Sequence, residues 1–211
     1  MAPEHEDYSA GWYNRFAKHP YVKPLGVNSG VMLMNLTRMR AFDWEQYLQP
    51  VMNQYKMDIV WGDQDIINII FHSNRGKCRL INACWLFLLE KQINTTLHVI
   101  LLEKLYVFPC HWNYRPDHCI YTQVCKSIYK NGVKIIHGNR DAFVSDKLPV
   151  FKRIYFAIKN YNFEEDKQQY LIQPMTEMVM KTINTNCGKH YKYLMKALSA
   201  ALTNWLLMSH T

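Results

Sequence analysis

Residues 59–71 have the sequence IVWGDQDIINIIF, in which an amide lies between two carboxylates at the start of a strongly apolar segment. Ile66, Ile67 and Ile70 recur at the spacing of one helical face, and Gly62 is a plausible start for that helix. The two carboxylates could simply cap the helix and favour its dipole, an effect of about 0.5–2 kcal/mol for a cap. Capping does not account for the amide, so the segment predicts a helix whose first turn is also a candidate ligand site.

Three polar groups share one placement, at the end or flank of a predicted strand or helix. They are Asp63-Gln64-Asp65, Asn28-Ser29-Gly30 and His137-Gly138-Asn139-Arg140. In open α/β sheets, ligands bind where the ends of strands leave polar loops around a crevice. We therefore expect the three groups to meet at one site. Two of the groups also have a plainer explanation, since Asp63 could be an N-cap and His137 a strand-end histidine with an ordinary hydrogen bond.

The composition is that of an ordinary globular protein of 211 residues, with a formal net charge of +8. This positive charge suits a polyphosphate ligand, nucleic acid or an anionic surface. The basic residues are scattered, so we do not expect a nucleic-acid-binding protein. We also expect neither a secretory signal at the acidic N-terminus nor a membrane span, because polar residues interrupt the most apolar region, residues 85–102.

Six cysteines allow three disulfides, in a pairing that the sequence does not fix. Cys110-His111 and His118-Cys119 superficially resemble a metal cluster, but their spacing matches no common zinc pattern. We therefore favour disulfides formed in an oxidising lumen over a zinc site.

The order of predicted elements indicates an α/β domain that leads into a helical C-terminal part at residues 150–211. The apolar run at residues 31–36 predicts a strand buried on both faces of its sheet. Residues 44–55 predict a helix with a capping box at Asp43 and a kink at Pro50. Further strands are expected at 107–108 and 133–136, and further helices at 150–161, 175–183 and 191–207.

Four stretches, taken in this order, resemble the retaining glycosyltransferases of family 8: GVNSGVMLMNL at 26–36, WGDQDIINIIF at 61–71, VFPCHWNYRPDHC at 107–119 and IIHGNR at 135–140. They are most similar to the glucoside xylosyltransferases, which add xylose in alpha-1,3 linkage to O-linked glucose on EGF-like repeats of proteins such as Notch. The similarity extends from residue 1 to about residue 193. It makes the chain a single partial domain, interrupted by an unusual insertion at residues 78–106 to which we assign no chemistry.

The resemblance implies a GT-A fold, UDP-xylose as donor and Mn²⁺ on the donor diphosphate. Asp63, Gln64 and Asp65 would form the catalytic group, in which Asp63 holds sugar hydroxyls. Gln64 would lie below the anomeric carbon, where a neutral amide can stabilise developing charge without forming a stable covalent adduct. The candidate contacts to the donor sugar are Asn28, Ser29 and Gly30.

On the phosphate side, the resemblance makes His137 a metal ligand, a role that suits a neutral imidazole. The candidate contacts to the diphosphate are Gly138, Arg140 and Lys147. An aromatic platform for the acceptor sugar could come from the segment after Cys110, although an aromatic cluster beside a proline is just as often part of a core. The candidate acceptor residues are Trp112, Asn113 and Tyr114.

The chain also departs from the family pattern. No Asp-x-Asp metal motif precedes Asn28, so we expect an incomplete GT-A fold that lacks its N-terminal nucleotide-binding half. With His137 as the remaining protein ligand, Mn²⁺ should bind weakly and the chain by itself should be inactive or nearly so. Asp141 stands where the family has glycine, and its carboxylate would be unfavourable near a diphosphate unless it faces away.

The resemblance also implies that full-length members of the family are type II membrane-anchored enzymes of the Golgi or ER lumen. Their acceptors would be O-glucosylated EGF-like repeat proteins. The alternative is a non-catalytic carbohydrate- or protein-binding remnant of such an enzyme, and a basic nucleic-acid-binding protein ranks third.

Asn35-Leu36-Thr37 and Asn94-Thr95-Thr96 match the N-glycosylation sequon. Since the first falls in a strand predicted to be buried, only the second is expected to accept a glycan.

Overall fold

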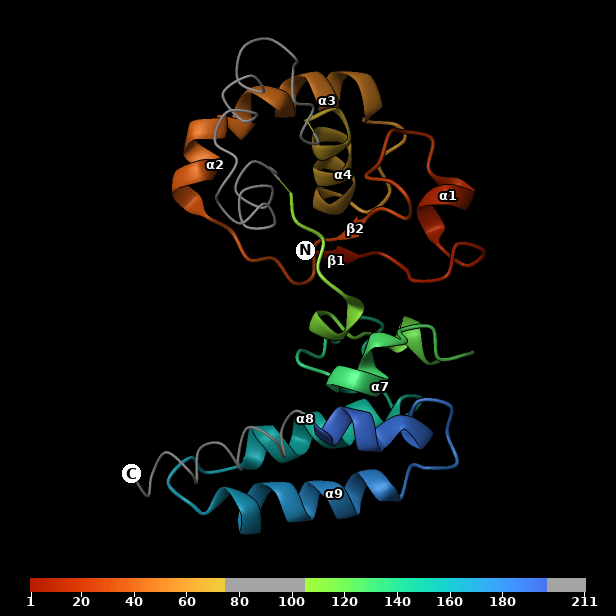
Figure 1. Cartoon of the computed structure of the whole chain (residues 1–211), viewed down its shortest axis with the longest axis vertical. Coiled ribbons are helices and arrows are strands. Elements are labelled where there is room, and N and C mark those ends of the chain that lie inside the picture. The colour runs from red at the N-terminus through yellow and green to blue at the C-terminus, as the bar shows by residue number, and fades with distance from the viewer. Residues whose placement is uncertain (75–104, 197–211) are drawn as a thin grey trace, which may run out of the picture. The chain divides into compact units, whose positions relative to one another are not determined.

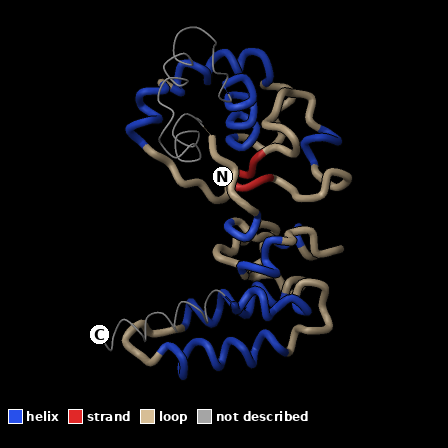
Figure 2. Tube along the Cα trace, in the orientation of Figure 1, coloured by secondary structure: helices blue, strands red, loops and turns tan. Residues whose placement is uncertain are grey.

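The computed structural model describes residues 1–74 and 105–196, which form helices and one small sheet (Figures 1 and 2). The chain divides into two compact units. Unit 1 contains residues 1–4 and 8–108, and unit 2 contains residues 5–7 and 109–211. Residues 78–104 of the predicted insertion, with the sequon at 94–96, lie outside the described residues.

The sheet of unit 1 has two short antiparallel strands, β1 (Ala2–Pro3) and β2 (Val27–Asn28). Helix α1 (Trp12–Phe16) lies between them in sequence. A small core packs beside the strands and consists of Met1, Val22, Val27 and Leu105. β2 thus ends at Asn28, the first residue of a predicted ligand group, in a buried position.

Helix α4 (Asp63–Asn74) confirms the helix predicted from the apolar spacing. Gly62 precedes it with a φ of 57°, a conformation that glycine adopts without steric cost. The Gly62 carbonyl accepts the first helical hydrogen bond, from Ile66 N at 3.2 Å. Asp63 is therefore the first residue of the helix and not its N-cap. A second small core of unit 1 joins α4 to α3 through Val51, Ile69 and Ile70.

The strand predicted at residues 31–36 is wrong. Residues 31–35 form no strand, and Leu36 begins helix α2 (Leu36–Phe42). The Leu33 side chain is 93% exposed, so the apolar run is not buried. A strand needs a neighbouring ladder for its backbone groups, and no described strand lies beside this run. Asn35 instead caps a helix, because its Oδ1 accepts from Arg38 N at 3.0 Å.

The helix predicted at residues 44–55 is present in two pieces, the 3₁₀ helix η1 (Trp44–Tyr47) and α3 (Leu48–Tyr55). The predicted capping box is wrong, since Asp43 makes no side-chain cap hydrogen bond and has a φ of 50°. Pro50 lies in the first turn of α3, where its missing N–H costs no helical hydrogen bond, and the kink expected there stays a prediction.

Within the described residues, the regular elements of unit 2 are helices. In chain order they are η2 (Cys110–Trp112), η3 (Pro116–His118), α7 (Ser127–Asn131), α8 (Pro149–Asn160), the π-helix η4 (Gln168–Ile172), α9 (Gln173–Met180) and η5 (Gly188–His190). α8 and α9 pack side by side (Figure 1), and they bury Phe151, Met175 and Val179. They confirm two of the predicted C-terminal helices.

Of the third predicted helix, residues 191–196 are helical and the rest lies outside the described residues. Within residues 1–74 and 105–196, none of the helices is long and apolar enough to cross a bilayer.

The strands predicted at residues 107–108 and 133–136 are wrong. Among the described residues, this part of the chain has only a single parallel bridge, between Tyr114 and Ile136. Each segment makes isolated backbone hydrogen bonds and no continuous ladder; for example, Phe108 N donates to Met1 O at 2.8 Å. Sequence alone does not reveal such pairing, because it depends on partners far away in the chain.

Two disulfides close unit 2, Cys110–Cys125 and Cys119–Cys187. They confirm the preference for disulfides over zinc at these positions. Cys110 and Cys119 belong to different bridges, so their flanking histidines do not share a cysteine-based metal site. Cys78 and Cys84 lie outside the described residues.

Candidate functional site

In unit 1, the end of β2 meets the first turn of α4 through the Gln64 side chain. Gln64 Oε1 accepts from Asn28 Nδ2 at 2.7 Å and from Ser29 N at 3.1 Å. Asn28 Oδ1 in turn accepts from Gly30 N at 3.0 Å. Two of the three predicted polar groups therefore form one hydrogen-bonded unit, although they lie far apart in the sequence.

The Asp65 carboxylate is fully buried and points into the protein. Its Oδ2 accepts from the amides of Val60 and Trp61, both at 2.7 Å. Its Oδ1 accepts from the Tyr13 hydroxyl at 2.7 Å and lies 3.5 Å from His19 Nε2. Burial and the hydrogen bond to Asp65 raise the pKa of Tyr13, so its hydroxyl remains a donor. Asp65 thus fixes the loop that leads into α4.

Asn68 lies one turn further along α4 and holds β2 and its approach. It is fully buried, and its Oδ1 accepts from Val22 N at 3.3 Å and Val27 N at 2.9 Å. Its Nδ2 donates to Val27 O, Gln64 O and the Tyr13 hydroxyl. Asn68 was not among the residues predicted from the sequence, although an amide inside an apolar helical face indicates a side chain that satisfies buried backbone groups.

Asp63 points outward, in contrast to its two neighbours. Its side chain is exposed and makes no hydrogen bond or ion pair within residues 1–74 and 105–196. Nearby, the ring of Trp61 packs on Trp12 with centroids 4.4 Å apart and on Tyr13 edge to face at 5.7 Å. This first turn therefore offers one free carboxylate beside an aromatic cluster, a combination that suits sugar hydroxyls and the apolar face of a sugar ring.

In unit 2, His137 is held on both its backbone and its side chain. Its amide donates to Tyr114 O at 2.8 Å, and its Nδ1 lies 3.1 Å from Asn113 Oδ1. Because an amide oxygen only accepts, this pair leaves the proton on Nδ1 and the lone pair on Nε2. Burial, with the nearby charge of Arg115, lowers the pKa of His137, so the ring is neutral near pH 7.

Asp117 anchors the loop that follows His137. Its two oxygens accept from Asn139 Nδ2 and from Arg140 Nε, both at 2.6 Å. Burial alone would raise the pKa of this carboxyl, but these partners and Arg115 outweigh it and lower the pKa. Asp117 was also missed from sequence, because its partners follow it by more than 20 residues.

The remaining phosphate-side candidates lie in different surroundings. A Cβ on Gly138 would come within 2.3 Å of the Phe143 ring, so close packing explains this glycine. Lys147 is exposed, and Asp141 is exposed with a φ of 55°, the left-handed region that favours glycine. The backbone therefore shows why a glycine would suit position 141.

The residues predicted to contact the acceptor sugar differ in their exposure. Trp112 is 42% exposed, whereas Asn113 and Tyr114 are buried, with 1% and 0% exposure. The Tyr114 hydroxyl accepts from Gln123 Nε2 at 2.6 Å. Only Trp112 offers a surface to a sugar, because Asn113 and Tyr114 serve the interior of unit 2.

Among the described residues, no three His, Cys, Asp or Glu side chains come together as a metal site. His137 Nε2 can supply one ligand, but the nearby carboxylate of Asp117 is already bonded through both oxygens. The donor set in residues 105–196 therefore does not fit a complete Mn²⁺ site, which generally relies on carboxylate oxygens. The meeting of His137 with the Gln64 group stays a prediction.

Comparison with known proteins gives the same family as the motifs. The chain is similar to glucoside xylosyltransferase 1 of Mus musculus, with 42% identity over 97% of this chain and 46% of that protein. It is also similar to glucoside xylosyltransferase 1 of Gallus gallus, with 43% identity over 96% and 43%, and to glucoside xylosyltransferase 2 of Xenopus laevis, with 40% identity over 96% and 44%.

The chain spans less than half the length of these relatives. No solved structure matches it. The mixture of helices with a small sheet is compatible with part of a GT-A fold. The model of glycosyl transferase family 8 matches residues 13–142, which is more than half of the chain and includes all four motifs. The chain therefore belongs to glycosyl transferase family 8.

Proposed function

We propose that the chain contributes the donor-sugar side of a retaining transferase that moves xylose from UDP-xylose to O-linked glucose, in alpha-1,3 linkage, on EGF-like repeats of proteins such as Notch. The observation that carries the proposal is the hydrogen-bonded group of Asn28, Ser29 and Gln64, next to Asp63, whose exposed carboxylate makes no hydrogen bond or ion pair with the described residues. The names of the relatives support the choice of xylose and of a glucoside acceptor.

The three polar residues of the first turn of α4, Asp63, Gln64 and Asp65, have different proposed roles. Asp63 accepts from donor-sugar hydroxyls, because its carboxylate is exposed and free among the described residues. Asp65 is a positioning residue, since it is buried and holds the loop before α4. Gln64 faces the anomeric carbon, but both lone pairs of its Oε1 are used in this state. One of these hydrogen bonds must be released when the donor binds.

On the phosphate side, His137 and Arg140 are proposed contacts to the diphosphate region, with Lys147 and Gly138 nearby in sequence. Mn²⁺ remains the proposed metal of the complete enzyme. We route no step through it, because the described residues supply only the His137 imidazole. We propose that the enzyme works in the Golgi or ER lumen, which the disulfides of unit 2 support.

The chain by itself is proposed to have little or no transferase activity. The second candidate is therefore a non-catalytic carbohydrate-binding remnant, favoured by the incomplete metal donor set. The two candidates differ in outcome, since a remnant binds sugar without hydrolysing or transferring the donor.

Saturation-transfer NMR with UDP-xylose tests the donor proposal, because it detects weak binding and assigns it to the sugar or the nucleotide. We expect xylose signals with the full chain, and their loss in Asp63→Asn. Glu45→Gln is the matched control, since it removes another exposed carboxylate of unit 1 and should keep the signals. The absence of xylose signals at millimolar donor would contradict the proposal. Release of xylose or its transfer to an O-glucosylated peptide separates the enzyme from the remnant.

Isothermal titration with UDP, with and without Mn²⁺, tests the proposed weak metal binding. A single imidazole should give little Mn²⁺ dependence in the affinity for UDP. Tight binding that requires Mn²⁺ would show that this chain holds a complete metal site.

A further inference from the structure

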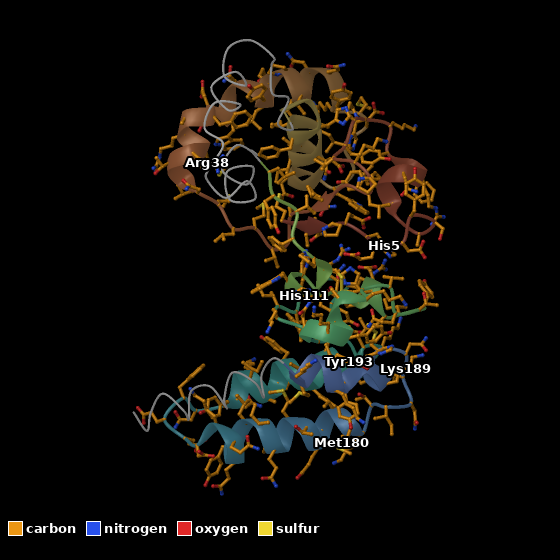
Figure 3. The ribbon with its side chains drawn as sticks, viewed as in Figure 1. His5, Arg38, His111, Met180, Lys189 and Tyr193 are labelled. Atoms are coloured by element: carbon orange, nitrogen blue, oxygen red, sulfur yellow. A yellow bond between two sulfur atoms is a disulfide. The ribbon has the colours of Figure 1, made fainter. Side chains whose placement is uncertain are left out.

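The sequon Asn35-Leu36-Thr37 lies at the exposed start of α2, where a buried strand was expected. All three residues are exposed, and α2 has no buried residue along its length. Figure 3 labels Arg38 on this helix. We propose that Asn35 is an attachment site for an N-linked oligosaccharide. This inference goes beyond the proposed sugar transfer and does not depend on it.

The hydrogen bonds of Asn35 leave free the atom that such a modification needs. Its Oδ1 accepts from Arg38 N at 3.0 Å, which caps α2. Its Nδ2 has no partner among the described residues. A glycan is attached to Nδ2 and leaves Oδ1 as an acceptor, so the modified side chain keeps its cap. The native fold therefore loses neither a hydrogen bond nor buried surface on modification.

The transfer step has a defined balance. A new bond forms between Asn35 Nδ2 and C1 of the first sugar of a polyisoprenyl-diphosphate-linked oligosaccharide. The bond between that C1 and the diphosphate oxygen breaks, Nδ2 gives up one proton, and polyisoprenyl diphosphate leaves. The Thr37 hydroxyl completes the acceptor sequon.

The surroundings of Asn35 give the glycan a physical role. Leu33 is 93% exposed, Met34 49% and Leu36 56%, so exposed apolar residues stand on both sides of Asn35 in the sequence. Exposed contiguous apolar surface favours association between chains. A bulky, hydrated glycan at Asn35 covers part of these apolar residues and keeps the chain soluble.

The modification requires the lumen of the secretory pathway. Disulfides also form there more readily than in a reducing cytosol. The bridges Cys110–Cys125 and Cys119–Cys187 therefore agree with a glycan at Asn35.

The test uses the full chain carrying Asn94→Gln, directed into the ER of cultured cells by a cleavable signal peptide. We expect a mobility shift that peptide N-glycosidase F removes, with conversion of Asn35 to aspartate detected by peptide mass spectrometry. Thr37→Ala should abolish the glycan, and the matched variant Thr37→Ser should retain it because it keeps the hydroxyl. Both variants change the same exposed helical position, so a folding defect would not separate them.

An unglycosylated Asn35 in chain recovered from the ER would overturn the inference. A peptide N-glycosidase F-sensitive mobility shift that persists in Thr37→Ala would overturn it as well, because the glycan would then be attached at another residue.

Discussion

Replacing Asn68 by alanine should release β2 from α4 and thereby loosen the donor-side group. Asn68 Oδ1 is the acceptor for the amides of Val22 and Val27, and alanine leaves both without a partner in a buried position. An unsatisfied buried donor costs about 1–3 kcal/mol, so the two amides together predict a loss of about 2–6 kcal/mol. Urea unfolding followed by tryptophan fluorescence measures this loss, because Trp12 and Trp61 lie in the same unit.

Hydrogen exchange at the two amides makes the test specific. Each amide should exchange at least about 10-fold faster in Asn68→Ala, since about 1.4 kcal/mol corresponds to a factor of ten. Asn53→Ala is the matched control, because Asn53 is an exposed amide on α3 whose Oδ1 accepts from Gln49 Nε2 at 2.7 Å. The loss of stability in this variant should stay within about 0.5 kcal/mol. A loss below about 1 kcal/mol for Asn68→Ala, with unchanged exchange, would refute the role of Asn68.

Three further predictions concern unit 2 and use urea unfolding as the assay. Replacing Cys119 and Cys187 together by serine should cost about 4 kcal/mol, because their bridge spans 68 residues, and an unchanged midpoint would contradict this. Burial, with Arg115 nearby, lowers the pKa of His118 well below its usual value, so the unfolded chain takes up the proton first. Stability should therefore be full above about pH 6.5 and fall as the pH decreases below it, and His118→Gln should flatten that dependence. Asp141→Gly should stabilise the chain by up to about 1 kcal/mol, because Asp141 has a φ of 55°, whereas a loss of stability would show that its side chain contributes.

The sequence predicted those elements whose hydrogen bonds are local. α4, α8 and α9 follow from apolar spacing, because a helix satisfies its backbone within one segment. The run at residues 31–36 has strong strand character, but a strand depends on neighbours that the run itself does not specify. Without a described neighbour, the short-range bond from Arg38 N to Asn35 decided the conformation.

For the candidate site too, some features were predictable from the sequence and others depend on residues far away in the chain. The placement of polar residues at the ends of predicted elements led to the expectation that the groups of Asn28 and Gln64 meet, and hydrogen bonds from Asn28 and Ser29 to Gln64 confirm that they do. That placement did not separate Asp63 from Asp65, because both are acids in one helical turn. Burial separates them, and burial depends on Tyr13 and His19, about 50 residues earlier in the chain.

Helix geometry explains why three consecutive polar residues have three different surroundings. Successive side chains on an α-helix point about 100° apart, so Asp63, Gln64 and Asp65 cannot all face one ligand. Asn68 is three residues after Asp65 and four after Gln64, which places it beneath both on the inner side of α4. If the Asn68 side chain points into the protein, the Asp65 side chain must do so as well, and Gln64 must then point toward β2. Asp63 is left on the exposed side of the helix, as observed. The double variant Asn68→Ile with Ile67→Asn moves the side-chain amide by one position without changing the composition. The new asparagine should point away from the Val22 and Val27 amides, and the hydrogen-bonded group of Asn28, Ser29 and Gln64 should be lost.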